Sequence, residues 1–333
     1  MRRLAANPVT HPGRLNMPLH HWLVGTVGFI ASGSERIGTC FLVRVRSETL
    51  PDRDHGYIVT ARHNLYQEDR SGADAPDRPR ADLAIHMPYE GLLEPVIIPA
   101  PHGEWTEGEE DVAAFPWFDQ DDERPFNAIP LYSHASHNAG IMPLIGNEAF
   151  YAGLLGDSAF QAMRKPMVMS ASVGAHYVKG VRYDEQNSYT VKYAHLLDCR
   201  SREGFSGSPV FVQGAYPGSR TYPLPELWQQ EHPDAGSLGG MHYFAVLWGM
   251  LVGWARYAGV AIVLPVEVVE QLLMKEELVA KRKRLDDEKK AERKKDGLGA
   301  EPMRRDPFGR EEFMDDLRKA TKPYPPEQSD QEA

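Results

Sequence analysis

Cysteine is scarce in this chain, with only Cys40 and Cys199 among 333 residues. Two cysteines cannot cross-link a chain of this length, which excludes a disulfide-dense scaffold and favours a reducing compartment. No apolar run reaches the roughly 18 residues that a membrane-spanning helix requires, so we expect no membrane partner. Basic residues are outnumbered, 37 against 47 acidic ones, and the formal net charge is −10. Because phosphate binding depends on a basic surface, we also expect no nucleic-acid partner.

The N-terminus begins with Met1-Arg2-Arg3, and an apolar stretch follows at residues 22–30. A signal peptide would place its apolar region close behind the charged residues and before a small-residue cleavage site. Here three prolines and three histidines lie between the two features, and no such site follows cleanly. We therefore interpret residues 22–30 as a strand and expect a cytoplasmic protein rather than a secreted one.

Short runs rich in aromatic and β-branched residues recur along the chain up to about residue 265. After a turn at residues 32–34, residues 39–45 form the second arm of a predicted β-hairpin with residues 22–30. Further runs lie at 57–60, 83–86, 95–98, 112–117, 148–155, 167–173, 188–193, 210–212, 243–254 and 260–264. Many short strands with almost no helical periodicity predict an all-β sandwich or barrel.

Helical spacing of apolar residues first becomes convincing behind Pro265, a residue that can open a helix. From Lys275 onward charges of both signs alternate, which is typical of a solvated helix face. After Gly297 the chain turns rich in proline and charge. We expect residues 276–333 to be a charged helical and then disordered tail, which offers a contact for a protein partner.

Three short segments carry the side chains of an acyl-transfer site. They are Thr60-Ala61-Arg62-His63, Glu110-Asp111-Val112-Ala113-Ala114 and Gly204-Phe205-Ser206-Gly207-Ser208-Pro209. A serine hydroxyl is a poor nucleophile, so it needs an imidazole to take its proton and a carboxylate to orient that imidazole. Ser206, His63 and Asp111 are therefore the candidate nucleophile, base and orienting residue. The glycines beside Ser206 allow a tight turn in which the N–H groups of Gly204 and Ser206 form an oxyanion hole.

Two alternatives compete with this interpretation. Asp82 also begins an Asp-hydrophobic-Ala segment, but it lies only 19 residues after His63, which leaves little room for intervening strands. Residues 204–208 nearly match the G-x-S-x-G elbow of α/β-hydrolases, with Asp234 and His242 following in that fold's order. That elbow requires a strand-to-helix transition, whereas the residues after Ser206 continue as a strand. We favour Asp111 and the all-β interpretation.

The three segments resemble those of the trypsin-like, chymotrypsin-fold serine peptidases. Residues 60–63 are similar to the family's T-A-A-H, residues 111–114 to its D-hydrophobic-A-hydrophobic, and residues 204–209 to its G-x-S-G-G-P. The intervals suit the family too, with 48 residues from His63 to Asp111 and 95 from Asp111 to Ser206. The resemblance implies a serine endopeptidase that acts on a protein or peptide substrate.

The same resemblance implies an architecture of two antiparallel β-barrels. It covers about residues 21–275, with the first barrel at about 21–125, the second at about 140–265, and a closing helix from 265. Residues 1–20 would be an N-terminal extension. The strand motif Gly38-Thr39-Cys40-Phe41 further resembles the disulfide-poor bacterial Deg/HtrA-type branch, although the PDZ module frequent there is not visible after residue 275. No histidine pair shows metal-ligand spacing, and we expect no cofactor.

Three residues are candidates for substrate binding. Arg200 lies six residues before Ser206, near the position that forms the base of the specificity pocket in trypsin-like enzymes. An arginine there favours an acidic substrate side chain, unless it turns to solvent. Gly249 and Gly253 either let a substrate backbone add to a strand edge or simply relieve packing. The segment 214–240 is predicted to be a long surface loop.

Several residues depart from the family pattern. Arg62 replaces an alanine beside the histidine, and Ser208 replaces a glycine, and both are expected to alter the rim of the pocket. Phe205 stands where activated zymogens carry an aspartate, so activation by a new N-terminus is not expected. Asn64 follows His63 in place of a cysteine, which predicts that Cys40 is a buried free thiol. These departures leave open a second interpretation, a catalytically inactive trypsin-fold binding or scaffold module.

Overall fold

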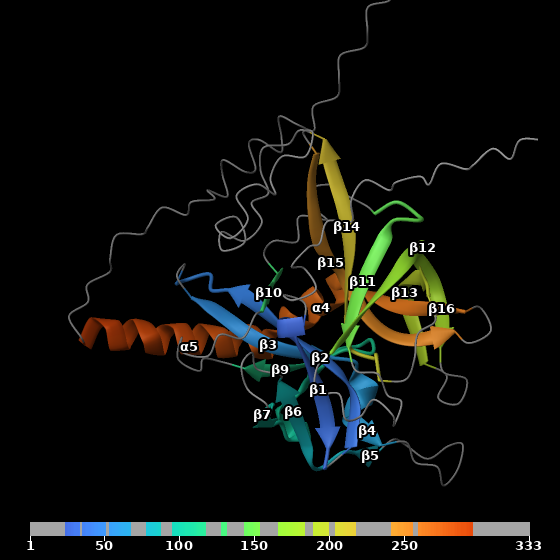
Figure 1. The fold of residues 1–333 in the computed structure, drawn as a ribbon. Helices are drawn as coiled ribbons and strands as arrows, with labels where there is room; N and C mark the ends of the chain where they lie inside the picture. Colours follow the sequence, from blue (N-terminus) through green and yellow to red (C-terminus); the bar gives the residue numbers. More distant parts are fainter. Residues whose placement is uncertain are drawn as a thin grey trace, which may run out of the picture.

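The computed structural model describes residues 24–33, 35–50, 53–67, 78–87, 95–117, 128–131, 143–153, 166–183, 189–199, 204–217, 241–255 and 259–295. These residues form two largely antiparallel β bodies, and two helices follow them in the chain (Figure 1). The first body is a curled sheet and the second a closed six-stranded barrel. The predicted all-β fold of the two-barrel chymotrypsin type, with a C-terminal helix, is confirmed.

The first sheet has the strand order β7-β6-β1-β2-β3-β9-β8, and β10 pairs with β2. Its strands are β1 (Val27–Ser32), β2 (Glu35–Arg46), β3 (Asp54–Thr60), β6 (Leu83–Met87), β7 (Val96–Pro99), β8 (Thr106–Glu107), β9 (Ala113–Trp117) and β10 (Ile129–Pro130). β4 (Tyr66–Gln67) pairs with β5 (Arg78–Pro79), and two short 3-10 turns are η1 (Arg62–Leu65) and η2 (His102–Glu104). The strand predicted at residues 22–30 begins only at Val27, because residues 24–26 are helical.

The closed barrel has the order β11-β12-β13-β16-β15-β14. Its strands are β11 (Glu148–Gly153), β12 (Met167–Tyr183), β13 (Tyr189–Asp198), β14 (Pro209–Pro217), β15 (Met241–Ala255) and β16 (Val260–Pro265). The strands β12 and β13 are longer than predicted and form a ribbon with two irregularities in its register. Residues 214–217 extend β14 rather than opening a loop, and the rest of the predicted loop, residues 218–240, lies outside the described part.

The position of the core explains why the two bodies pack together. Central strands bury apolar side chains on both faces, since along β3 Tyr57 and Val59 belong to one hydrophobic cluster and Ile58 to another. One hydrophobic cluster joins Phe41 and Tyr57 of the first sheet to Phe211 of the barrel and to Leu272 of the following helix. Where the two bodies meet, Thr39 of β2 bonds to Thr60 at the end of β3 and to Ser206 just before β14, and the predicted motifs lie at this junction.

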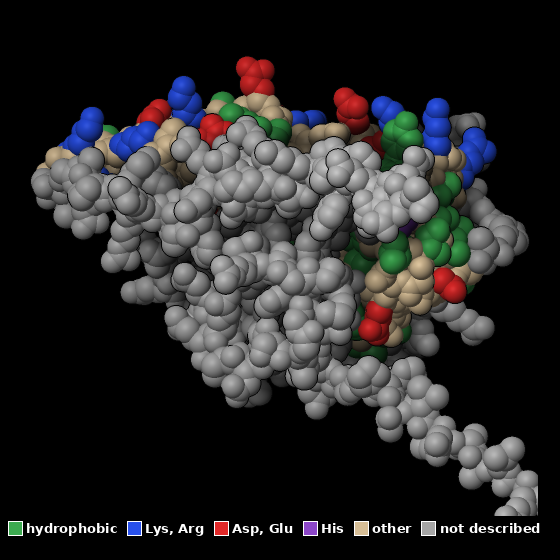
Figure 2. Space-filling view, turned by 90° about the horizontal axis from the view of Figure 1, so that it is seen from above, with side chains coloured by type: hydrophobic (Ala, Val, Ile, Leu, Met, Phe, Trp, Pro, Cys, Tyr) green, Lys and Arg blue, Asp and Glu red, His purple; other side chains and the backbone are tan. Residues whose placement is uncertain are grey.

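Two helices follow the barrel, α4 (Val266–Leu273) and α5 (Glu276–Lys295). The helix α4 buries the apolar residues that predicted it. The expectation of a merely solvated α5 is incomplete, because Leu278, Arg282 and Asp286 recur every four residues and are buried. The opposite face carries exposed charges of both signs (Figure 2). Neither of these helices is long and apolar enough to cross a membrane.

Polar contacts dock α5 on the first sheet. The Asp286 carboxylate accepts hydrogen bonds from Ser47 Oγ at 2.6 Å and Thr49 Oγ1 at 3.0 Å. It also lies 3.0 Å from Nε2 of His55 on β3 and 3.7 Å from Nη1 of Arg53. Burial lowers the pKa of His55. We call these five residues the α5 latch.

A second contact reinforces the latch one helical turn earlier. Arg282 Nη1 donates to Tyr57 Oη of β3 and to the carbonyl of Leu273, both at 2.8 Å. Both residues of β3 that bind α5 precede Thr60 on the same strand. The helix α5 therefore supports the strand that leads into the predicted His63 segment.

Candidate active site

His63 and Asp111 lie in direct contact. Strand β3 ends at Thr60, and η1 then places His63 Nδ1 2.7 Å from Asp111 Oδ2. The His63 backbone N–H donates to Asp111 Oδ1 at 2.9 Å, so both carboxylate oxygens are used. Because a carboxylate only accepts, Nδ1 carries a proton, and in the neutral imidazole the lone pair is then on Nε2. The Asp111 side chain is 3% exposed and that of His63 is 25% exposed, which leaves the imidazole accessible from solvent.

The alternative carboxylate, Asp82, has a different partner. Its Oδ1 accepts a hydrogen bond from Ser32 Oγ at 2.5 Å in an exposed position. The structure therefore brings Asp111, and not Asp82, to His63. The α/β-hydrolase alternative is excluded as well, because β14 directly follows Ser206 and no strand-to-helix elbow is present at that point.

The loop that carries Asp111 and the adjoining strand β8 are tied to four neighbouring parts of the chain. Arg62 Nη1 of η1 donates to Gly108 O at 3.5 Å, and Tyr66 Oη donates to Glu107 Oε1 at 2.6 Å. Lys275 Nζ, at the junction of α4 and α5, donates to Glu107 O at 2.5 Å. The Glu110 carboxylate also accepts from the β13 backbone. Arg62, one of the departures from the family pattern, thus helps to hold the Asp111 loop.

Ser206 lies on a tight turn at residues 204–208, which we call the nucleophile turn. Gly204 and Gly207 have φ values of 92° and 91°, which residues with side chains rarely adopt. A Cβ at Gly207 would also collide with the carbonyl of Thr39. Phe205 is buried beneath the turn, edge-on to Tyr151 at a centroid distance of 5.2 Å. These residues fix where the Ser206 side chain emerges.

The polar groups of the nucleophile turn differ in their hydrogen bonds and in their burial. The Ser206 hydroxyl donates to Val252 O on β15 at 3.3 Å. The N–H groups of Gly204 and Ser206 make no hydrogen bond within the described part of the chain. Ser208 is fully buried, so it does not lie on a pocket rim as predicted. The structure thus brings the predicted nucleophile and both predicted oxyanion donors into one turn.

The three predicted substrate-binding residues differ in where the structure places them. Arg200 lies outside the described residues. Gly249 is paired on both sides, with Val210 and Pro265, and a Cβ there would collide with the backbone of β16, so the packing interpretation holds for it. Gly253 pairs with β16 on one side only, because the pairing between β14 and β15 ends at Met250. Gly253 alone of the two glycines therefore lies beside an open strand edge among the described residues.

Three further residues of the site were missed at the sequence level. Thr39, Thr60 and Asn64 are buried polar residues that contact one another or the nucleophile turn. The available signal was their position, since Thr39 and Thr60 are polar residues of largely apolar strands within a motif, and Asn64 directly follows His63 in η1. Both cysteines are free, and burial raises the pKa of the Cys40 thiol.

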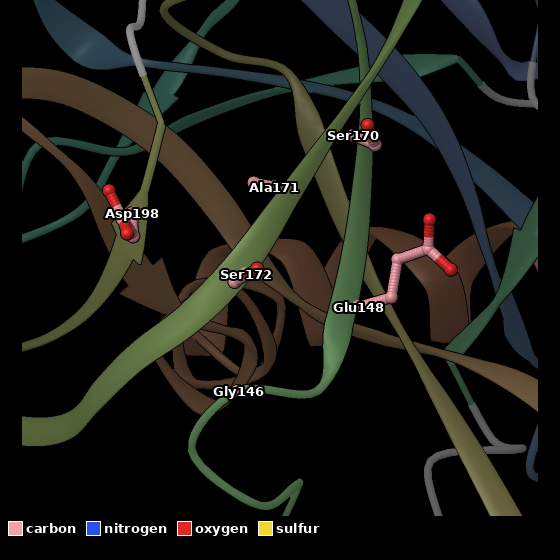
Figure 3. Close-up of a pocket in the computed structure, with 6 residues that line it drawn as sticks. All are labelled: Gly146, Glu148, Ser170, Ala171, Ser172 and Asp198. Atoms are coloured by element: carbon pink, nitrogen blue, oxygen red, sulfur yellow. The ribbon is translucent and has the colours of Figure 1, made fainter. Parts of the chain in front are cut away.

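A polar hollow of about 410 Å³ lies over β11, β12 and β13 (Figure 3). It is lined by Gly146, Glu148, Ser170, Ala171, Ser172 and Asp198. In Figure 3 the two carboxylates lie on opposite sides of Ser172 and do not converge. None of the predicted catalytic residues lines this hollow. Among the described residues, no group of three or more His, Cys, Asp or Glu side chains is arranged to hold a metal ion.

No family model matches the sequence, and no curated protein matches it significantly. Solved structures that resemble the chain include an inactive form of Rv3671c, a protease from M. tuberculosis, at 16% identity and a TM-score of 0.43. That match covers 80% of this chain and 93% of the other. Human heparin binding protein matches at 10% identity over 76% and 91% of the chains, with a TM-score of 0.41. A glutamic-acid-specific serine protease matches at 17% identity over 72% and 92%, with a TM-score of 0.32.

Proposed function

We propose that the protein is a serine endopeptidase that hydrolyses peptide bonds through Ser206, His63 and Asp111. The observation that carries the proposal is the His63–Asp111 pair at 2.7 Å beside a turn that presents Ser206. A buried carboxylate that fixes the imidazole tautomer leaves Nε2 as a base, and such a base can accept the proton of a neighbouring hydroxyl. The backbone segment of His63 lies against the nucleophile turn, because Asn64, the residue after His63, bonds to the Ser206 carbonyl at 3.0 Å.

In the first half of the proposed reaction the enzyme is acylated. The Ser206 hydroxyl turns from Val252 O toward His63 by rotation about its Cα–Cβ bond. Oγ then adds to the substrate carbonyl carbon while its proton passes to Nε2. The N–H groups of Gly204 and Ser206 stabilise the resulting oxyanion, each by about 3–4 kcal/mol in comparable sites. Collapse breaks the C–N bond, and Nε2 returns its proton to the leaving amine.

In the second half the acyl-enzyme is hydrolysed. A water molecule adds to the Ser206 ester and gives one proton to Nε2. Collapse of this intermediate breaks the bond to Oγ, which regains the proton, and releases the carboxylic acid. Asp111 stays ionised throughout and stabilises the imidazolium that forms twice in the cycle.

The substrate class in this proposal is a protein or peptide in extended conformation. The open edge of β15 around Gly253 supports it, since an extended backbone pairs with such an edge. We further propose a Deg/HtrA-like peptidase domain at residues 21–275, acting in the cytoplasm without cofactor. The charged tail from 276 onward is then a candidate contact for a protein partner.

One observation favours the alternative of an inactive binding module. The Ser206 hydroxyl donates to Val252 O, a carbonyl that cannot accept its proton in catalysis. In an inactive module this hydrogen bond would be the permanent state of the side chain. In an enzyme it is one of two rotamers, and substrate binding selects the other.

Labelling with a fluorophosphonate probe separates the two functions, because this reagent reacts only with an activated serine. We expect the wild type to label and the adduct to map to Ser206. Ser206→Ala and His63→Ala should not label, whereas Ser172→Ala, which removes an exposed serine of β12, should label as the wild type does. An unlabelled wild type, or a labelled Ser206→Ala variant, would refute the proposal.

A further inference from the structure

A chain of buried hydrogen bonds connects the first sheet to the nucleophile turn. Thr39 Oγ1 donates to Gly204 O at 2.7 Å, and the Thr39 N–H donates to Ser206 O at 2.9 Å. Asn64 Nδ2 donates to the same Ser206 carbonyl at 3.0 Å. Thr60 links Thr39 to Asn64, because its Oγ1 donates to Thr39 O at 2.7 Å and accepts from Asn64 Nδ2 at 3.0 Å. We call Thr39, Thr60 and Asn64 the clamp.

The partners of Asn64 fix the orientation of its amide. The Ser206 carbonyl can only accept, so it must face the NH₂ group rather than the amide oxygen. Thr60 Oγ1 uses its hydrogen for Thr39 O and therefore also needs a donor. Both hydrogens of Nδ2 are thus engaged, in a residue that is only 4% exposed. A side chain without two donors on one atom cannot replace it.

The local sequence makes room for the clamp. A Cβ at residue 38 would collide with the Asn64 amide, and Gly38 has none. The glycine at 207 likewise lets the Thr39 carbonyl approach the turn. Gly38, Thr39 and Gly207 therefore belong to one arrangement, in which the first sheet grips the turn that carries Ser206.

The clamp fixes two peptide groups on either side of the Ser206 N–H. Thr39 holds the Gly204 carbonyl, while Thr39 and Asn64 hold the Ser206 carbonyl. Within the turn, the Ser208 N–H donates to Phe205 O at 2.9 Å. Because a peptide group is planar, fixing the Phe205 carbonyl sets the opposite direction for the Ser206 N–H. All three carbonyls from 204 to 206 are engaged, whereas the N–H groups of Gly204 and Ser206 make no hydrogen bond to any described residue and can bind an anion.

We propose that Thr39 and Asn64 are positioning residues, which hold the nucleophile turn so that the Gly204 and Ser206 N–H groups converge on the oxyanion. The inference rests on the proposed peptidase function and adds residues to it. Neither side chain touches the substrate in this scheme. They act through the backbone carbonyls of the nucleophile turn. Their loss should therefore slow the reaction of Ser206 while His63 remains intact as the base.

The test compares matched substitutions by the second-order rate constant for fluorophosphonate labelling. Thr39→Val keeps the shape but loses the hydroxyl, and Thr39→Ser keeps the hydroxyl. Asn64→Ala removes both donors. Misplacing the reacting groups by about 1 Å costs up to about 100-fold, so we expect Thr39→Val and Asn64→Ala to label about 10- to 100-fold more slowly. Thr39→Ser should retain the rate within a factor of about three.

Two controls separate positioning from a general loss of stability. Ser47→Ala removes a buried hydrogen bond of the α5 latch and should lower the melting temperature without slowing labelling of the folded protein. The pH midpoint of labelling should be the same in Thr39→Val, Asn64→Ala and the wild type, because the His63–Asp111 pair is untouched. A shifted midpoint would show that the clamp acts on the base, and would overturn the inference.

The remaining outcomes distinguish this inference from the proposed function. Thr39→Val and Asn64→Ala variants that label at the wild-type rate overturn the positioning role alone. Slowing in Ser47→Ala to the same degree would show a stability effect and also overturns it. A wild type that does not label removes the proposed function, and the inference with it. The positioning role is established if Thr39→Val labels slowly while Thr39→Ser and Ser47→Ala label at about the wild-type rate.

Discussion

Asp286 is the residue whose removal should most weaken the attachment of α5. Its carboxylate is 4% exposed and serves Ser47, Thr49 and His55 at 2.6–3.0 Å, with Arg53 at 3.7 Å. In Asp286→Ala the buried donors of Ser47 and His55 lose their acceptor, at about 1–3 kcal/mol for each group. The substitution also takes the carboxylate away from the Arg53 guanidinium, and breaking a buried charge pair from one side costs about 3–5 kcal/mol. We therefore expect Asp286→Ala to lower the free energy of unfolding by about 3–5 kcal/mol.

The adjacent residue provides a matched control. Asp287 is exposed on the same helix, and Asp287→Ala makes the same change in composition and net charge. We expect it to change the free energy of unfolding by no more than about 0.5 kcal/mol. Asp286→Asn keeps one acceptor oxygen and should fall between the two alanine variants.

Urea denaturation followed by tryptophan fluorescence measures these differences, and amide hydrogen exchange locates them. We expect exchange in Asp286→Ala to rise in α5 and in β3, which carries His55 and Tyr57. A loss below about 1 kcal/mol, or one equal to that of Asp287→Ala, would refute the view that a buried polar latch holds α5. Fast exchange of α5 in the wild type would contradict it as well.

Two further predictions concern titration and the choice of carboxylate. Burial lowers the pKa of His55 below its ordinary value of 6.5, so as the pH falls the unfolded chain takes up this proton first. We therefore expect the His55 contribution to the free energy of unfolding to be fully present above pH 6.5 and to decline below it. Urea denaturation at about pH 7.5 and pH 5.5 measures this decline, which should be lost in His55→Gln. An unchanged slope would show that other groups cause it. Asp111→Asn should slow fluorophosphonate labelling by about 10⁴-fold, because the imidazole tautomer is no longer fixed. Asp82→Asn should leave labelling unchanged, and the reverse result would reassign the carboxylate.

Many strands were predictable because their signals are local. Short apolar runs, predicted at 83–86 and 112–117, mark β6 and β9 closely, and the helical spacing after Pro265 marks α4. The contact between His63 and Asp111 could be anticipated only as the product of two motifs at a suitable interval. Strand ends were less accurate, since the extension of β12 to Tyr183 depends on its pairing with β13 rather than on its own composition.

The docking of α5 could not be predicted from its composition. A mixed-sign helix usually solvates all of its charges, and nothing in residues 276–295 alone marks Asp286 as different from Asp287. Its main partners, Ser47 and His55, lie more than 230 residues earlier in the chain. The clamp was hidden for the same reason, because Asn64 acts on a carbonyl 142 residues away.

The attachments of the Asp111 loop bear on when the site is completed during synthesis. The loop belongs to the first sheet, yet Glu110 bonds to β13 and Glu107 to Lys275. Domains emerge from the ribosome and fold from their N-terminal end. The nucleophile turn is therefore made 69 residues before the lysine that completes the hydrogen bonds of the Asp111 loop. In a nascent chain, the orienting carboxylate obtains its full support only after both barrels and α4 have left the ribosome.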